Sequence, residues 1–151
     1  MNDDELNWAA GMFEGEGTIR IAKNWSPKGE RTYSLQCMVS NTDHSIIDFF
    51  NDRWPGGNRP ERPRGNQRPQ RRWVVSGKQA EAFLRKLRPH LRTNRVLKKV
   101  NVAFLFQIQK KLYRDDPSDR AKYLDEQRNC YEKMKRFNAR GAPAKRGTLG
   151  E

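Results

Sequence analysis

Two stretches near the start of the chain alternate between apolar and polar residues. In residues 18–24, Ile19 and Ile21 fall on one side of an extended chain. In residues 31–40, one side carries four apolar residues, namely Tyr33, Leu35, Cys37 and Val39. A period of two is typical of a half-buried strand, and the Pro- and Gly-containing residues between the stretches indicate a turn. The pattern therefore predicts a β-hairpin.

Other stretches carry apolar residues at helical spacing, and these predict helices over 4–14, 43–53, 78–88, 94–113 and 119–138. Residues 72–76 read as a strand. Residues 58–72 contain three prolines, which exclude a central strand but allow an edge strand or an extended arm. The order is helix, two strands, helix, two strands, then three helices, which predicts an α+β fold with four antiparallel strands.

The first predicted helix is apolar on most sides, as in a helix buried inside a domain or between two subunits. We expect Asp3 or Asp4 to cap its start and Gly15 and Gly17 to end it. The lysine pairs of the 94–113 helix, Lys98–Lys99 and Lys110–Lys111, are expected at solvated or phosphate-facing edges.

Composition narrows the class of protein. The chain has 151 residues, a formal net charge of +13 and a sequence pI near 10.2. No apolar run approaches the roughly 20 residues that cross a bilayer, and the acidic start does not resemble a signal peptide. Its two cysteines are too few for a disulfide scaffold, so we expect an intracellular protein. So basic a protein favours a polyanionic partner, most commonly nucleic acid.

The charge is unevenly distributed along the chain. Residues 1–58 carry 5 Lys+Arg against 9 Asp+Glu, residues 59–100 carry 14 against 2, and residues 101–151 carry 12 against 7. An acidic segment weakens nucleic-acid binding unless a cation bridges it to phosphate. The first segment is therefore where we look for a metal site.

The run Ala9-Ala10-Gly11-Met12-Phe13-Glu14-Gly15-Glu16-Gly17, followed at once by a strand, resembles the LAGLIDADG motif of homing endonucleases. Glu14 and Glu16 stand where the motif has aspartates. The order of predicted elements also matches the family's αββαββα repeat. The resemblance implies a LAGLIDADG domain over 1–113 with a four-stranded antiparallel DNA-binding saddle, a C-terminal helical extension over 114–140, and a basic flexible tail over 141–151.

Glycine spacing supports the same interpretation independently. Gly11 and Gly15 lie four residues apart, on one face of a helix, where small residues allow two helices to approach closely. Two such helices, one from each subunit, would bring both copies of Glu16 together. Paired carboxylates favour a divalent cation, and we expect Mg²⁺, with Ca²⁺ or Mn²⁺ able to substitute. The predicted dimer contacts are Ala10, Gly11 and Gly15.

The resemblance also assigns roles to individual residues. Glu16 is implied as the metal-binding catalytic acid, helped by the Gly15 carbonyl, while Glu14 is expected to be mainly structural. Asn94 stands where the family often has a lysine, Arg95 is the nearest cation, and Ser40 is a candidate for positioning water. The candidate DNA contacts of the saddle are Arg20, Asn24, Thr32, Ser34, Gln36, Met38, Arg59, Arg62, Arg64, Arg72 and Val74.

The sequence thus predicts a homodimeric, Mg²⁺-dependent, site-specific endonuclease that cuts double-stranded DNA with staggered 3′ overhangs, as in intron or intein homing. Two alternatives remain open on the same scaffold. Because Asn94 cannot supply a positive charge, the protein could bind DNA without cutting it. It could also bind RNA as a maturase.

Overall fold

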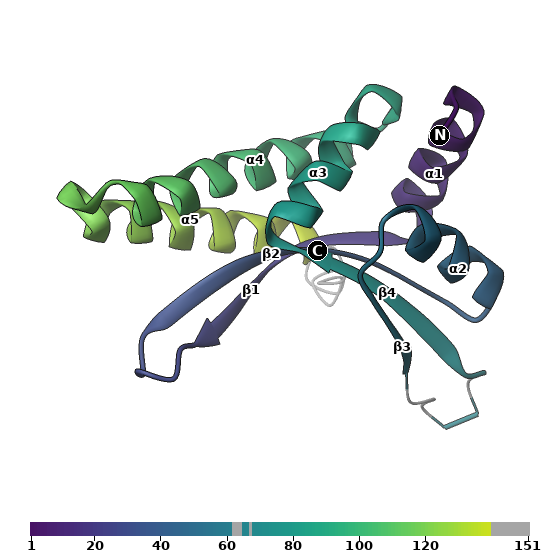
Figure 1. Cartoon of the computed structure of the whole chain (residues 1–151), viewed down its shortest axis with the longest axis horizontal. Helices are drawn as coiled ribbons and strands as arrows, with labels where there is room; N and C mark the ends of the chain where they lie inside the picture. The colour runs from purple at the N-terminus through teal and green to yellow at the C-terminus, as the bar shows by residue number, and fades with distance from the viewer. Residues whose placement is uncertain (62–64, 67, 140–151) are drawn as a thin grey trace, which may run out of the picture.

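A computed structural model describes residues 1–61, 65–66 and 68–139, and its element order is the predicted one (Figure 1). The elements are α1 (Asp3–Glu16), β1 (Gly17–Trp25), β2 (Arg31–Asn41), α2 (His44–Arg53), β3 (Gly57–Glu61), β4 (Gln70–Ser76), α3 (Gly77–Leu87), α4 (Asn94–Asp115) and α5 (Arg120–Asn138). Two short 3₁₀ helices, η1 (Arg88–His90) and η2 (Pro117–Asp119), flank α4. The predicted α+β class is confirmed.

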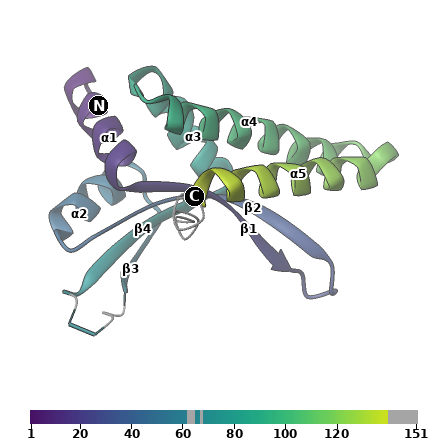
Figure 2. The same cartoon turned by 180° about the vertical axis from the view of Figure 1, so that it is seen from behind.

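The four strands form one antiparallel sheet in the order β1-β2-β4-β3. The helices lie on one face of this sheet, and its two hairpins splay away from them, so that the opposite face is concave (Figures 1 and 2). The predicted alternation along β2 is confirmed, because Tyr33, Leu35, Cys37 and Val39 are buried and the residues between them are partly exposed. The intervening side chains therefore belong to the concave face.

The core lies between the sheet and the helices. Its largest side chains form an aromatic cluster in which the Phe83 ring lies 4.9 Å from Trp73 and 4.8 Å from Trp54, measured between ring centroids. Trp73 Nε1 donates a hydrogen bond to the Trp54 carbonyl at 2.8 Å, so this buried indole is not left without a partner. The cluster joins α2 and α3 to β4 and fixes the helices over the sheet.

Helix α1 differs from its prediction at both ends. Asn2, not Asp3 or Asp4, caps the start, and its side chain accepts from the Glu5 backbone N–H at 2.8 Å in a capping box. The helix also runs through Gly15 to Glu16, because the Gly17 N–H still donates to the Phe13 carbonyl. Glu16 is therefore the last residue of the helix, directly before β1.

The proline-rich stretch gives an edge strand. β3 lies at one edge of the sheet and contains Pro60, whose missing N–H an edge position tolerates. β4 begins at Gln70, two residues earlier than predicted. The basic tail over 141–151 lies outside the described residues.

Helix α5 closes the fold over β1 and α4. Asn138 Nδ2 donates to the Ile19 carbonyl at 2.8 Å, which covers part of the free edge of β1. Lys99 is buried, and the half-buried Lys110 donates to the Tyr33 carbonyl, so the expectation of solvated or phosphate-facing edges is wrong for both. Among residues 1–61, 65–66 and 68–139, no helix is long and apolar enough to cross a membrane.

Gly17 is expected to tolerate no side chain. A Cβ there would lie 2.2 Å from Cδ1 of the buried Phe13 ring and 2.7 Å from the Phe13 carbonyl oxygen. Gly17→Ala should therefore lower the free energy of unfolding by about 1–3 kcal/mol, measured by urea denaturation. The control is Thr18→Ala at the next, exposed position, which should change it by less than about 0.5 kcal/mol. Equal effects of the two substitutions would contradict the packing argument.

Candidate active site and nucleic-acid interface

The end of α1 is bound to the start of α4 by one carboxylate. Glu14 Oε2 accepts hydrogen bonds from the backbone N–H groups of Arg92 at 3.0 Å and Thr93 at 2.7 Å, and from Thr93 Oγ1 at 2.7 Å. Partial burial raises the pKa of Glu14, but the hydrogen bonds outweigh this effect and hold the pKa below its ordinary value. The geometry agrees with the structural role expected of Glu14.

This contact brings the candidate residues of α4 to the end of α1. Arg95 Nη2 donates to the Glu14 carbonyl at 2.9 Å, where a cation is favoured by the negative end of the helix dipole. Asn94, the first residue of α4, is exposed beside it, and so is Glu16. Glu16, Asn94 and Arg95, which are far apart in the sequence, therefore belong to one region of the surface.

Ser40 reaches the same region through the sheet. Gly17 pairs with Val39 across β1 and β2, so Ser40, the next residue of β2, lies beside the junction of α1 and β1. Its hydroxyl faces Arg72 of β4, whose Nε lies 3.4 Å from Ser40 Oγ. Ser40 thus links the end of α1 to the concave face.

One face of α1 is open. Gly11 and Gly15 are exposed, and a Cβ built on either would meet nothing within 4 Å. Trp8, also on the exposed side, keeps 43% of its surface accessible while its ring packs against Phe49. Ala10 has no exposed surface because it packs into the core of its own chain, so its prediction as a dimer contact is wrong.

The concave face carries the predicted polar side chains of β1 and β2 in cross-strand pairs. Arg20 lies opposite Gln36, and Arg20 Nε donates to Gln36 Oε1 at 2.8 Å. Asn24 lies opposite Thr32, whose Oγ1 lies 3.4 Å from the Asn24 carbonyl. The remaining candidates of β2 are the partly exposed Ser34 and Met38.

The predicted DNA contacts of the second hairpin that the structure describes lie on β3 and β4, and those on β4 pair with residues of β2. Val74 pairs with Met38, and Arg72 pairs with Ser40. Arg59 lies opposite Arg72 in the backbone register of β3 and β4. Arg62 and Arg64 lie outside the described residues.

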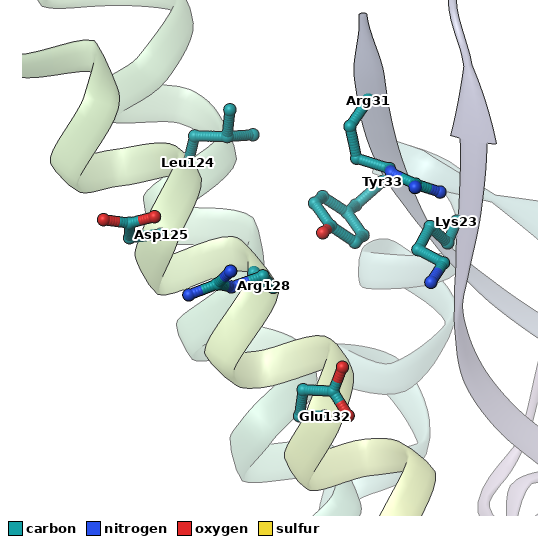
Figure 3. Close-up of a pocket in the computed structure, with 7 residues that line it drawn as sticks. All are labelled: Lys23, Arg31, Tyr33, Leu124, Asp125, Arg128 and Glu132. Atoms are coloured by element: carbon teal, nitrogen blue, oxygen red, sulfur yellow. The ribbon is translucent and has the colours of Figure 1, made fainter.

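A hollow lies between the first hairpin and α5 (Figure 3). It is bounded by Lys23 and Arg31 of the strands, by Tyr33, and by residues of α5, namely Leu124, Asp125, Arg128 and Glu132. Tyr33 is buried, and burial raises its pKa. Because cations and carboxylates are mixed here and the hollow faces the helices, it does not belong to the concave interface.

The oxygen atoms at the end of α1 are suitable ligands for a hard cation, but one chain supplies few of them. A carboxylate at Glu16 and a carbonyl at Gly15 are oxygen ligands of the kind that Mg²⁺ prefers. In the part of the chain that the structure describes, no three His, Cys, Asp or Glu residues gather as a metal centre. A complete ligand set would therefore need groups from outside this chain.

Sequence reasoning missed two features of the site. The hydrogen bond between Arg20 and Gln36 depends on the β1–β2 register, which the lengths of the strands and turn alone do not fix. The Thr93 contact with Glu14 joins residues 79 apart in the chain. Only the motif resemblance, which gives the first acid a structural role, pointed to such a contact.

Known proteins were compared with this chain by sequence and by structure. No family model and no curated protein matches the sequence. Solved structures do match. The homing endonuclease I-CvuI, in complex with its target in the presence of 2 mM Ca, is 17% identical with a TM-score of 0.71, and the match covers 91% of this chain and 85% of that one.

Two further structures give the same result. The group I intron-encoded homing endonuclease I-CeuI, complexed with DNA, is 12% identical with a TM-score of 0.67 over 88% of this chain and 67% of that one. The LAGLIDADG homing endonuclease I-GzeII, in complex with a DNA target, is 9% identical with a TM-score of 0.68 over 83% of this chain and 43% of that one. The chain therefore has the LAGLIDADG homing endonuclease fold, as its motif predicted.

The Glu14 contact should stabilise the protein in a pH-dependent way. Because the folded-state pKa lies below the ordinary value of 4.5, the stabilisation is complete above pH 4.5 and is lost as the pH falls through the lowered pKa. Glu14→Gln should cost about 1 kcal/mol of unfolding free energy at pH 7.

The difference between the wild type and Glu14→Gln should shrink as the pH falls below 4.5. Urea denaturation at several pH values measures it. The control is Glu30→Gln in the exposed hairpin turn, which should change the free energy of unfolding at pH 7 by less than about 0.5 kcal/mol. A Glu14→Gln difference that stays constant down to pH 3 would contradict the assignment.

Proposed function

We propose that this protein is a site-specific DNA endonuclease of the LAGLIDADG type that acts as a homodimer on double-stranded DNA. The observation that carries the proposal is the position of Glu16. Its exposed carboxylate ends α1, beside the open glycine face and at the edge of the concave sheet. The fold is shared with enzymes whose structures contain bound DNA targets. The concave face would follow the major groove, and the basic residues of the chain would neutralise phosphates.

The proposed dimer is supported by how much of each similar structure this chain matches. It covers 85% of I-CvuI but only 43% of I-GzeII, as expected for a chain that holds one αββαββα unit where a longer protein holds two. One unit supplies one Glu16. A second copy, packed through the Gly11 and Gly15 face, would supply the other.

The residues at the end of α1 fit a divalent cation. The Glu16 carboxylate and the Gly15 carbonyl would hold Mg²⁺, with Ca²⁺ or Mn²⁺ as substitutes, together with the same groups of a second copy and with DNA phosphate oxygens. Two of the matching I-CvuI structures were obtained in the presence of 2 mM Ca and 2 mM Mg. When bound, such an ion activates water and stabilises the leaving oxygen of a phosphodiester.

The chain's own groups would complete the site. Arg95 would hold the end of α1 in place through the Glu14 carbonyl, and Ser40 would orient a water molecule beside it. One cut on each strand would then give staggered 3′ overhangs.

A second candidate function, DNA binding without cleavage, is favoured by Asn94. This exposed residue begins α4, where a cation near the scissile phosphate would be most useful, and it carries no charge. The nearest guanidinium, that of Arg95, is engaged with α1.

Cleavage separates the two candidates. With Mg²⁺ and a randomised duplex library, the wild type should produce discrete staggered cuts, and Glu16→Gln should reduce the cleavage rate at least about 100-fold while duplex binding persists. The matched control is Glu132→Gln, the same change at an exposed position of α5, which should leave the cleavage rate close to that of the wild type. Selective binding of duplexes by the wild type without any cut would instead identify a binding protein, and Asn94→Lys would be the next variant to test.

The dimer prediction uses the open face of α1. Gly11→Leu meets no atom of its own chain at the Cβ position, so the protomer should remain folded. The leucine should nevertheless prevent close approach of two α1 helices and shift the protein from dimer to monomer in sedimentation velocity. Lys98→Leu, an exposed change on α4, serves as the control and should leave the dimer intact. A Gly11→Leu protein that remains dimeric would exclude this face as the contact.

A further inference from the structure

The hydrogen bond between Arg20 and Gln36 has consequences for the DNA sequence that the concave face would select. Resting on the proposed function, we infer that these two residues read two adjacent base pairs as one unit, with guanine contacted by Arg20 and a keto base, guanine or thymine, contacted by Gln36. The two side chains lie directly opposite each other on β1 and β2, and Arg20 Nε donates to Gln36 Oε1 at 2.8 Å.

Arg20 gains a fixed orientation from this contact. Its Nε is held by Gln36, while its two terminal amino groups make no hydrogen bond to any described residue. A guanidinium held in this way presents two parallel donors, which match the O6 and N7 acceptors of guanine in the major groove. Less conformational freedom is lost on binding than for an unrestrained arginine, so the preference for guanine should be strong.

Gln36 loses one of its two ways of reading a base. A glutamine recognises adenine by accepting from N6 and donating to N7 with the same amide. Here one of the two lone pairs of the amide oxygen already accepts from a cation, which ties the oxygen to Arg20 and leaves it less free to turn toward adenine N6. The amide nitrogen keeps its donors, and these favour an acceptor on the neighbouring base pair. Guanine O6 and thymine O4 are such acceptors, and both belong to keto bases.

Asn24 provides an internal contrast on the same strand. It lies on the same face as Arg20, and its side chain makes no hydrogen bond with the described residues. Its amide therefore keeps both the donor and the acceptor that adenine recognition requires. Arg20 and Asn24 are four residues apart, about 13 Å along a strand. At a rise of about 3.4 Å per base pair, their contacts would lie roughly four base pairs apart.

The order of these contacts also follows from the fold. β1 begins directly after Glu16 and runs toward the hairpin tip, so Arg20 lies nearer the end of α1 than Asn24 does. In each half-site, the guanine and keto positions would thus lie nearer the centre of the target, and the adenine position nearer its outer end.

The experiment measures the preference for each base through duplex binding, independently of cleavage. The full-length wild type is used, without divalent metal, to select duplexes from a randomised library. All single-base variants of the best site are then measured by filter binding. The expected result is one position in each half-site where guanine is preferred at least about tenfold over the other bases. The adjacent position should prefer keto bases.

Two substitutions of Gln36 test the coupling. Gln36→Met keeps the length of the side chain but removes its acceptor, so the guanine preference should fall to about threefold or less because Arg20 is no longer held. Gln36→Glu restores an acceptor for Arg20 Nε and can only accept from a base. It should keep the guanine preference and change the adjacent preference from keto bases to amino bases, cytosine or adenine.

Asn24→Ala is the matched control. It should remove the adenine preference about four base pairs farther out while leaving the guanine position as in the wild type. The inference is overturned if wild-type Gln36 selects adenine, or if Gln36→Met leaves the guanine preference unchanged. A protein that retains no duplex at any salt concentration would overturn the proposed function itself. Binding with no dependence on Gln36 would overturn only the paired reading.

Discussion

The hydrogen bonds to the Glu14 carboxylate determine where the candidate site can be. They join the last turn of α1 to the two residues directly before α4, which lie 78 and 79 residues away in the sequence. Because β1 starts directly after α1, the same contact also sets where the first strand enters the sheet. A carboxylate is well suited to this role, since one charged oxygen accepts three hydrogen bonds at the start of a helix, where the positive end of the helix dipole favours a negative charge.

The fold separates two tasks between the two faces of the sheet. The helix-facing side chains of β2 are fully committed to the core, so they tolerate little variation in size. Its concave-face side chains pack against few other groups and are free to differ in chemistry. A protein of this architecture can therefore change what it recognises without changing how it folds. The pair formed by Arg20 and Gln36 is an exception, because each limits what the other can contact.

The sequence predicts best those elements in which the order of apolar and polar residues directly reflects which side chains are buried. The alternation in β2 predicted its core face because each second residue is either inside or outside. The end of a helix depends on which of several neighbouring side chains caps it. Asn2 caps α1, although Asp3 and Asp4 are residue types that could also have done so. Lys99 and Lys110 were misassigned because a long aliphatic stem can be buried while its ammonium group finds a backbone acceptor, as Lys110 does at Tyr33. Composition does not reveal such partners.

The candidate site could be predicted mainly through the motif. Ser40, Glu16 and Asn94 share no periodicity in the sequence, and only the fold brings them to one region of the surface.

Two exposed glycines lower the intrinsic stability of helix α1. Each exposed glycine in a helix costs about 1 kcal/mol relative to alanine, and neither Gly11 nor Gly15 avoids a clash within its own chain. The contrast with Gly17, where a Cβ would strike Phe13, shows that the two exposed glycines are not needed by the fold of the protomer. Under the proposed dimer, contacts between two closely approaching helices would offset this cost. The same close approach would bring together two Glu16 carboxylates that repel each other until a cation lies between them. The glycines and the acid would then act together. Gly11 and Gly15 lower the stability of the isolated helix, but they allow a second copy to approach closely enough to complete the metal site.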